Sequence, residues 1–338
     1  MSLIPVTIIT GFLGAGKTTL LNKILTNYHQ QKIAVIENEF GPENIDSSIL
    51  VEASAEEIIE MSNGCICCTV RGDLIAVLNL LAEKRLTQKL HFDRVIIETT
   101  GLADPGPVIQ TFFMDPEVSR AYLIDGIVTL IDAVHAMQQL DEFEEARRQV
   151  GFADRLLLSK TDLVNAMQVE LLVSRLRRIN LYASIDKVDF GHISLEKVVG
   201  LKGFHLNTKL DITVPITDHA HCHTGPCGPQ CSHNKIPHHL DDIQTFAFQS
   251  ERPFNHDMLN HFLSKMIQAY GNQMTRYKGI LYMENAECKV IFQGVQQLMG
   301  TDVAEKWRDD ETRQSKMVFI GKNLPQSAFL EGLKACLV

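Results

Sequence analysis

The sequence has no surplus of positive charge. Its 338 residues include 32 Lys and Arg against 41 Asp and Glu, which gives a formal net charge of -9. Nucleic acids and anionic membranes attract proteins through a positive field, and no stripe of basic residues occurs along this chain. The charge balance therefore argues against a nucleic acid or a membrane surface as the main partner.

Long apolar runs are also missing. No segment approaches the about 20 consecutive apolar residues of a membrane-spanning helix. The beginning, MSLIPVTIITGFLGAGKTT, has an apolar run broken by Pro5 and lacks the basic start of a secretory signal. We therefore expect a cytoplasmic protein, in which thiols stay reduced. Clustered cysteines are then better read as metal ligands or redox groups than as a disulfide framework.

Apolar, β-rich runs alternate with helical patterns over the first 200 residues, and no internal repeat interrupts them. Strands are predicted at 4–10, 32–37, 92–98, 126–133 and 155–159, and helices at 17–28, 73–85 and 143–150. Such alternation is typical of a mainly parallel sheet covered by helices on both faces, the α/β class.

The pattern divides the chain into three parts: an α/β domain at 1–205, a linker or insertion at 206–242, and a small α+β domain at 243–338. In the last part, strands are predicted at 242–250, 278–284, 289–298 and 317–322, and helices at 255–270 and 326–337. In the first of these helices, Met258, Phe262, Met266 and Tyr270 are expected to be core residues. Whether this domain binds a client, forms a dimer contact or only stabilises the chain stays open.

One motif predicts a nucleotide site. Residues 11–18 read GFLGAGKT, which matches G-x-x-x-x-G-K-[ST] in full and lies between a predicted strand and a predicted helix. Glycines let backbone N–H groups close around phosphate oxygens, and the helix N-terminus adds its positive dipole end. Lys17 should reach the β- and γ-phosphates, while Thr18 should hold Mg²⁺. The phosphate-binding residues are Gly11, Phe12, Leu13, Gly14, Ala15, Gly16, Lys17 and Thr18. The predicted fold is thus a P-loop NTPase domain followed by a small α+β domain.

Two motifs after later strands fit the same nucleotide. Glu98 ends the strand 92–98 and begins ETTG, the E-x-x-G form of a switch II segment. There the carboxylate acts on the Mg²⁺ shell, and Gly101 can approach the γ-phosphate. SKTD at 159–162 resembles the guanine-reading N-K-x-D, with Ser159 in place of the usual Asn. Asp162 would accept hydrogen bonds from the ring N–H and the exocyclic amine of guanine, and Lys160 would lie over the base. GTP is therefore favoured over ATP.

Three cysteines fall within four residues in NGCICC, residues 63–68. We interpret Cys65, Cys67 and Cys68 as a thiolate metal site, although a free cysteine is also often a small core residue. The spacing C-x-C-C differs from the C-x-x-C of zinc fingers.

A second cluster, HAHCHTGPCGPQCSHNKIPHH, holds six of the thirteen histidines within residues 219–239. Imidazole and thiolate are the donors that zinc, nickel, cobalt and copper prefer. A closed cage of Cys222, Cys227, Cys231 and His233 is one interpretation. The favoured one is a mobile Gly/Pro-rich loop that gathers Zn²⁺ or a similar ion and passes it to the first cysteine cluster. Its candidate ligands are His219, His221, Cys222, His223, Cys227, Cys231 and His233.

These motifs together resemble a known family. GFLGAGKTT, ENEFG at 37–41, GCICC at 64–68, ETTGLADP at 98–105 and SKTD at 159–162, in this order, resemble the CobW-type P-loop GTPases and in particular their bacterial YjiA-like branch. That family is related to the GTPases that insert nickel into urease and hydrogenase, and it includes proposed zinc metallochaperones. The resemblance covers almost the whole chain, because residues 243–338 resemble the CobW C-terminal domain.

The resemblance implies roles residue by residue. It extends the phosphate loop to Thr19 and implies a catalytic set of Lys17, Thr18 and Glu98. It also adds Glu37 and Glu39 of ENEFG to the metal ligands. Gly11 stands where the deviant Walker A ATPases carry an extra lysine, which makes an ATP-driven partitioning protein a poor match.

The predicted function is a GTPase whose nucleotide state is coupled to a metal site and which delivers Zn²⁺, or Co²⁺ or Ni²⁺, to a client metalloprotein. The C-x-C-C lies between the two switch segments. Contacts with the γ-phosphate order such segments until hydrolysis releases them. No arginine finger is identifiable, so we expect slow turnover and an accelerating partner. A metal buffer or storage protein with regulatory nucleotide binding, a P-loop small-molecule kinase, and a homo-oligomer stay open.

Overall fold

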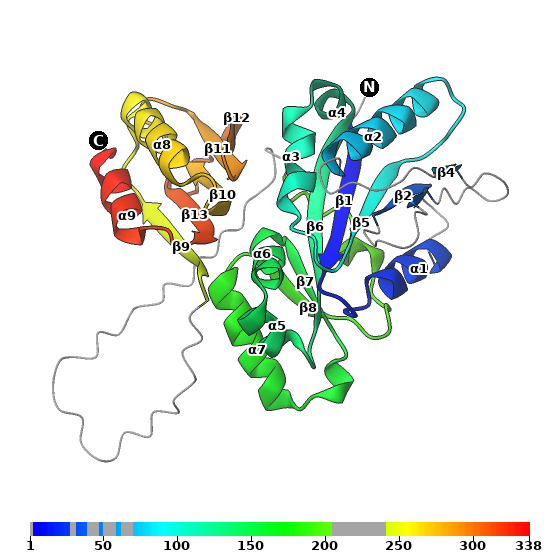
Figure 1. Ribbon diagram of the computed structural model, residues 1–338. Helices are drawn as coiled ribbons and strands as arrows, with labels where there is room; N and C mark the ends of the chain where they lie inside the picture. The colour runs from blue at the N-terminus through cyan, green and yellow to red at the C-terminus, as the bar shows by residue number, and fades with distance from the viewer. Residues whose placement is uncertain (1–2, 28–31, 39–46, 50–58, 62–69, 205–240) are drawn as a thin grey trace, which may run out of the picture.

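The computed structural model describes residues 3–27, 32–38, 47–49, 59–61, 70–204 and 241–338 (Figure 1). In its first part the strands are β1 (Ile4–Gly11), β2 (Ile33–Asn38), β3 (Ser47–Ile49), β4 (Ile59–Met61), β5 (Arg94–Thr99), β6 (Tyr122–Asp132), β7 (Arg155–Ser159) and β8 (Ser184–Lys187). The helices are α1 (Lys17–Asn27), α2 (Val70–Leu86), α3 (Gly106–Met114), α4 (Pro116–Ala121), α5 (Ala136–Glu142), α6 (Glu144–Phe152) and α7 (Ala166–Ile179), with the short 3-10 helices η1 (Thr161–Leu163) and η2 (Leu195–Lys197).

Six of these strands form one parallel sheet in the order β2-β5-β1-β6-β7-β8. Successive side chains of a strand point to opposite faces, so a strand buried on both faces is apolar throughout. In β1, Ile8 packs in a core with α2 and α3, whereas its neighbour Ile9 packs in a core with α1. In β7, Leu157 joins the α1 core, and Leu156 packs with α6 and α7. The predicted parallel sheet with helices on both faces is confirmed.

The second part is a five-stranded antiparallel sheet in the order β12-β11-β10-β13-β9. Its elements are β9 (Ile243–Ser250), α8 (His256–Tyr270), β10 (Met274–Leu281), β11 (Cys288–Val295), β12 (Leu298–Lys306), β13 (Ser315–Lys322) and α9 (Gln326–Ala335). The rings of Phe246, Phe319 and Phe329 lie 5.1 to 5.4 Å apart in the core between this sheet and its two helices. The predicted small α+β domain is confirmed. Within the described residues, no helix has the length and apolar character needed to cross a membrane.

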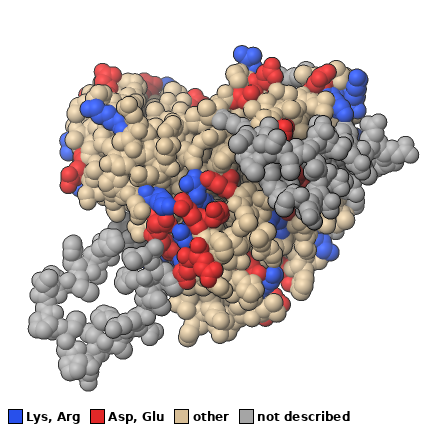
Figure 2. Space-filling model, viewed as in Figure 1, with Lys and Arg blue, Asp and Glu red and all other residues tan. Residues whose placement is uncertain are grey.

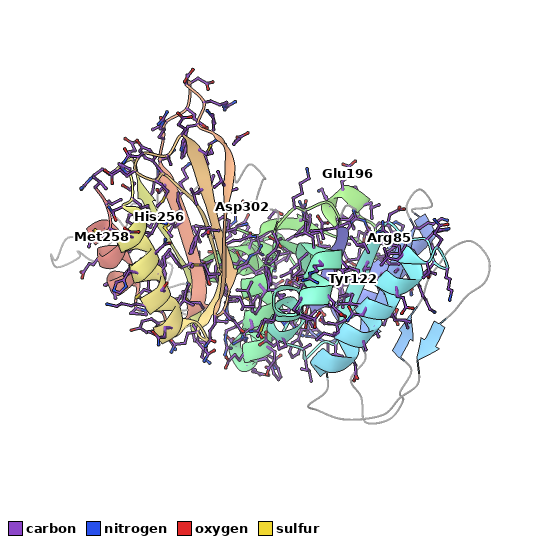
Figure 3. The ribbon with its side chains drawn as sticks, turned by 90° about the horizontal axis from the view of Figure 1, so that it is seen from above. Arg85, Tyr122, Glu196, His256, Met258 and Asp302 are labelled. Atoms are coloured by element: carbon purple, nitrogen blue, oxygen red, sulfur yellow. The ribbon has the colours of Figure 1, made fainter. Side chains whose placement is uncertain are left out.

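Two details of this part differ from the prediction. The run 289–298 is not one strand, because the chain turns after β11, where Gln296 has φ 53°, and β12 then begins at Leu298. The prediction of Met258 as a core residue is wrong, since it is 51% exposed on the outer side of α8 (Figure 3). Residues four apart on a helix drift around its axis by about 40° per step, so a row that is buried at Met266 has left the core by Met258.

Close packing and polar contacts join the two parts. Arg276 on β10 is 4% exposed and donates from Nη1 to the carbonyl oxygen of Phe152 at 2.9 Å, and its Nη2 lies 2.7 Å from Asp154. Its guanidinium also stacks 4.1 Å from the centre of the Phe204 ring. A residue of the antiparallel sheet is therefore fixed to the end of α6 and to the segment that leaves the parallel sheet.

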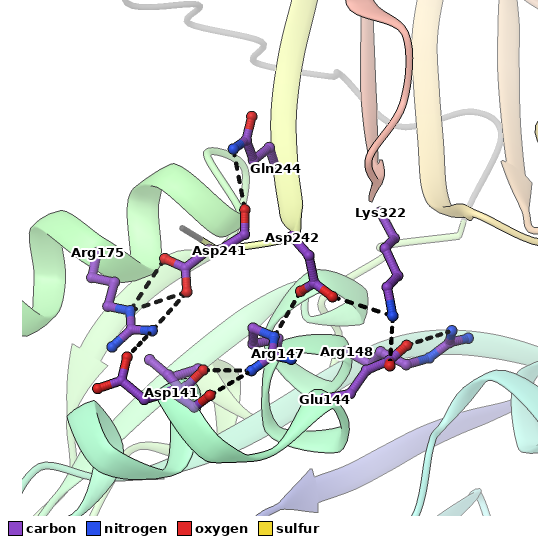
Figure 4. A network of polar contacts seen from close by, with 10 residues as sticks. Asp141, Glu144, Arg147, Arg148, Arg175, Asp241, Asp242, Gln244 and Lys322 are labelled. Carbon is purple, nitrogen blue, oxygen red and sulfur yellow. Dashed lines mark hydrogen bonds and ion pairs between the residues drawn. The ribbon is translucent and has the colours of Figure 1, made fainter. Parts of the chain in front are cut away.

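Charged side chains gather at this junction. Figure 2 shows acidic and basic residues together over α5 and α6, and Figure 4 shows their contacts. Arg175 of α7 is almost fully buried and binds Asp241, which lies two residues before β9, with Nη2 2.7 Å from Oδ1. Beside this pair, Asp242 contacts Arg147 of α6 at 2.7 Å and Lys322 of β13 at 3.2 Å. The chain thus enters the antiparallel sheet through two aspartates held by helices of the parallel sheet.

Candidate nucleotide site

The loop GFLGAGKT connects β1 to α1, as its sequence predicts. Gly11 has φ 141°, and a Cβ at this position would lie 2.4 Å from the carbonyl oxygen of Leu130 on the neighbouring strand. Gly14 and Gly16 also have positive φ, 74° and 98°, a region that side chains other than glycine disfavour. These glycines let the backbone turn tightly at the N-terminal end of α1, where free N–H groups and the helix dipole favour an anion.

Lys17 is the first residue of α1, and its side chain folds back over this loop. The residue is 8% exposed, and its Nζ donates to the carbonyl oxygens of Gly11 at 2.9 Å and Phe12 at 3.3 Å. Burial lowers the pKa of Lys17, while the nearby carboxylate of Glu98 acts in the opposite direction. An ammonium group held at the phosphate loop by two backbone carbonyl oxygens can exchange these contacts for the oxygens of an anionic ligand.

Glu98 approaches the loop because β5 pairs directly with β1. The register places Glu98 opposite Ile9, and Oε1 of Glu98 accepts from the hydroxyl of Thr18 at 3.0 Å. One residue further along the same two strands, the hydroxyl of Thr99 donates to the hydroxyl of Thr10 at 2.8 Å, which ties the ends of β5 and β1 together. The sheet register therefore brings together Thr18 and Glu98, which are 80 residues apart in the sequence.

The segment after β5, residues 100–105, is called the switch II loop below. It lies against the phosphate loop: a Cβ on Gly101 would lie 2.6 to 2.8 Å from the Leu13 atoms N, Cα and Cδ2. The side chain of Gln149, which is 1% exposed, holds the other side of the switch II loop. Its amide nitrogen donates to the carbonyl oxygens of Gly101 at 3.1 Å and Ala103 at 3.0 Å.

The SKTD segment also closes onto the phosphate loop. Ser159 ends β7, and its hydroxyl donates to the carbonyl oxygen of Ala15 at 2.8 Å. A hydroxyl thus links the SKTD segment to the phosphate loop although the Asn of the N-K-x-D motif is missing. Lys160 has φ 56°, and its Nζ contacts Asp132 at the end of β6 at 2.7 Å. Asp162 follows in the short helix η1.

Of the predicted metal ligands, only Glu37 belongs to the described residues. It lies near the end of β2, and the register of β2 and β5 places it opposite Glu98. Within the part of the chain that the structure describes, no group of three His, Cys, Asp or Glu side chains could hold a metal ion. The other candidates lie outside the described residues: Glu39, Cys65, Cys67, Cys68, His219, His221, Cys222, His223, Cys227, Cys231 and His233.

Two residues of this site, Asp132 and Gln149, are not predicted by the sequence motifs. Asp132 is a buried carboxylate at the end of a strand, and its register partner is Ser159. The position of Asp132, a charged residue near the end of the apolar run 126–133, could have indicated its role. Gln149 gave no such signal, because a single Gln in the predicted helix 143–150 looks like a solvent-facing residue.

Two family models cover most of the chain. Residues 5–186 match the nucleotide-binding domain of the CobW/HypB/UreG family, and residues 243–337 match the cobalamin synthesis protein CobW C-terminal domain. The chain belongs to the CobW family. The resemblance seen in its motifs is thereby confirmed.

Similar proteins agree with this assignment. The zinc chaperone YjiA of Escherichia coli is 39% identical over 96% of this chain and 96% of its own length. The zinc-regulated GTPase metalloprotein activator 1 of Schizosaccharomyces pombe is 32% identical over 97% of this chain and 85% of its own length. The crystal structure of the zinc-bound YjiA GTPase of E. coli superimposes with a TM-score of 0.79 at 35% identity, covering both chains in full.

Proposed function

We propose that this protein is a GTPase that binds zinc and delivers it to a client protein, with nucleotide state controlling the metal site. The observation that carries the proposal is the meeting of Lys17, Thr18 and Glu98 at the phosphate loop, close to the register position of Glu37. The zinc chaperone and the zinc-regulated GTPase metalloprotein activator that resemble this chain over most of its length support the same function.

The loop offers each group that a nucleoside triphosphate needs. Backbone N–H groups of residues 11–19 would bind the phosphates, and Lys17 would exchange its two carbonyl contacts for β- and γ-phosphate oxygens. The donor set fits Mg²⁺, because a hydroxyl and a carboxylate meet at 3.0 Å, and hard cations prefer such oxygens. Thr18 and Glu98 would hold this ion, which would neutralise charge on the phosphates. Hydrolysis needs no protein nucleophile, only positioned groups and an ordered water.

The base-reading segment supports guanine. Asp162 would pair with the ring N–H and exocyclic amine of guanine, whereas adenine offers no matching pair of donors. Lys160 is already held by Asp132 beside the position where a base would lie, so little side-chain freedom remains to be lost on binding. Ser159 replaces Asn without breaking the connection to the phosphate loop, since its hydroxyl reaches Ala15.

Zinc would be cargo at the sheet edge next to the nucleotide. Cys65, Cys67 and Cys68, with Glu37 and Glu39, are the proposed tight ligands, and the His/Cys segment 219–239 is the proposed accessory site. Directly opposite residues on neighbouring strands lie about 5 Å apart, so the register pair Glu37 and Glu98 places a proposed metal ligand beside a proposed nucleotide residue. Movement of either strand end, the one with Glu37 or the one with Glu98, would therefore displace the other.

The test combines nucleotide choice with metal release. In competition with a fluorescent guanine nucleotide, the affinity for GTP should be at least about tenfold higher than the affinity for ATP, a difference of about 1.4 kcal/mol. Lys17→Ala should abolish tight nucleotide binding, while Lys23→Ala on the same helix should leave it unchanged. Zinc transfer to an apo-client that proceeds equally with GTP and with a non-hydrolysable analogue would favour a metal buffer, and equal affinity for ATP and GTP would refute the guanine assignment.

A further inference from the structure

Helix α6 contacts both the switch II loop and the antiparallel sheet. It has nine residues, Glu144–Phe152, and five of them are buried: Ala146, Gln149, Val150, Gly151 and Phe152. Its N-terminal neighbour Phe143 also packs on Phe12 of the phosphate loop, with ring centres 4.7 Å apart. A single short helix thus contacts the nucleotide loops at several points.

Toward the switch II loop, α6 presents Gln149 and Arg148. The Gln149 amide bridges two carbonyl oxygens of the loop, and the residue's own carbonyl accepts from the buried hydroxyl of Thr129 at 2.9 Å. Arg148 lies 2.9 Å from Asp104 of the same loop. Asp104 in turn accepts from the backbone N–H of Gly106, the first residue of α3. The loop is therefore held along its length by two consecutive side chains of α6.

On its other side, the backbone of α6 lies close to the antiparallel sheet. A Cβ on Gly151 would lie 3.1 Å from Thr275 and 3.4 Å from Ile243, both in strands of that sheet. Ala146 and Val150 share a core with Ile243, Val318 and Ile320. The carbonyl oxygen of Phe152, the last residue of the helix, binds the buried guanidinium of Arg276.

An ionic chain runs in parallel with this packing. Asp104 contacts Arg148, Arg148 lies 4.0 Å from Glu144 one turn earlier, and Glu144 contacts Lys322 at the end of β13 at 2.6 Å. Figure 4 shows its α6 and β13 members. These groups are partly exposed, and exposed ion pairs contribute little stability. We therefore assign the main link between α6 and the antiparallel sheet to the buried packing. The ionic chain orients the two against each other.

We propose that α6 couples the switch II loop to the C-terminal sheet, and that Gln149 is the residue that positions this loop for hydrolysis. The inference rests on the proposed GTPase function and adds its regulation. A loop that moves between nucleotide states must break or remake its two hydrogen bonds to Gln149. Because interdigitated packing shifts as a unit, a displacement of α6 must reach β9 and β13 as well. A protein bound to the C-terminal sheet would then alter hydrolysis through the same helix.

The test replaces Gln149 by Met, which keeps the length of the side chain but removes its donor. We expect kcat for GTP to fall by at least about tenfold, because the loop is no longer fixed against the phosphate loop. The KM for GTP and the affinity for GDP should stay within about twofold, because the phosphate loop and base-reading segment are untouched. Gln138→Met on α5 is the matched control, since that exposed amide donates to Glu142 and, among the described residues, makes no hydrogen bond to the switch II loop.

A second readout follows coupling in the full chain. Hydrogen exchange in β9 and β13 should differ between GDP and a non-hydrolysable GTP analogue, and this difference should vanish in Gln149→Met. If that variant does not fold, Arg148→Gln serves instead, with a smaller drop in kcat. A variant kcat within twofold of wild type, or identical exchange in both nucleotide states of the wild type, would overturn the inference while leaving the GTPase intact. A wild type that does not hydrolyse GTP would overturn the proposed function and this inference together.

Discussion

The close approach of the switch II loop to the phosphate loop gives a sharp test at Gly101. In Gly101→Ala the added methyl group would lie 2.7 Å from the backbone nitrogen and 2.8 Å from the Cα of Leu13. Both are backbone atoms of the phosphate loop, and they cannot rotate away as the end of a side chain could. The two loops must therefore separate.

The size of this separation sets the expected effect. Non-bonded heavy atoms pack at about 3.5 to 4.0 Å, so relief of the contact requires a shift on the order of 1 Å. A misplacement of that size at a reacting centre costs about 100-fold, and part of it can be absorbed by the loop, so we expect kcat to fall by about 10- to 100-fold. The affinity for GDP, which lacks the γ-phosphate, should change much less.

The assay is phosphate release at saturating GTP, with GDP affinity measured on the same samples. Gly300→Ala is the matched control, because a Cβ at Gly300 in β12 would meet no atom of the other described residues within 4 Å, its chain neighbours aside. It should hydrolyse GTP at the wild-type rate. If Gly101→Ala does so too, the contact between the two loops has no part in hydrolysis and the reasoning is refuted.

Three further predictions concern stability and metal binding. Asp241→Ala leaves the buried guanidinium of Arg175 with only part of its partners and should lower the free energy of unfolding by about 3 kcal/mol in a urea titration; a loss under about 1 kcal/mol would contradict this. Burial lowers the pKa of Lys278 to about 8 in the folded protein, against 10.5 as the ordinary value. Between these pH values the unfolded chain binds the extra proton, so wild type should gain stability relative to Lys278→Met as the pH rises through this window, and a constant difference would refute the shift. Thiolate-to-cobalt absorption should appear when Co²⁺ is added and vanish in the triple Cys→Ala variant of Cys65, Cys67 and Cys68; absorption that survives would place the tight site elsewhere.

Local patterns predicted much of the fold and the nucleotide loop. The glycines of GFLGAGKT indicate a tight backbone turn. Strands buried on both faces, such as β1 and β7, are recognisable as continuous apolar runs. Contacts between distant segments were not predictable in this way. The hydroxyl of Ser159 meets a carbonyl 144 residues earlier, and the role of Gln149 depends on how α6 lies against the switch II loop. Met258 shows the same limit, because its spacing fits a helix face but the sheet covers a different arc of that face.

Control of metal affinity by the nucleotide state is tested most directly by one measurement. The zinc dissociation constant of the full chain should be determined by competition with a chromophoric chelator, once with GDP bound and once with a non-hydrolysable GTP analogue. Coupling of the usual size predicts that the two constants differ by about 5- to 150-fold. Equal constants in the two nucleotide states would contradict the account.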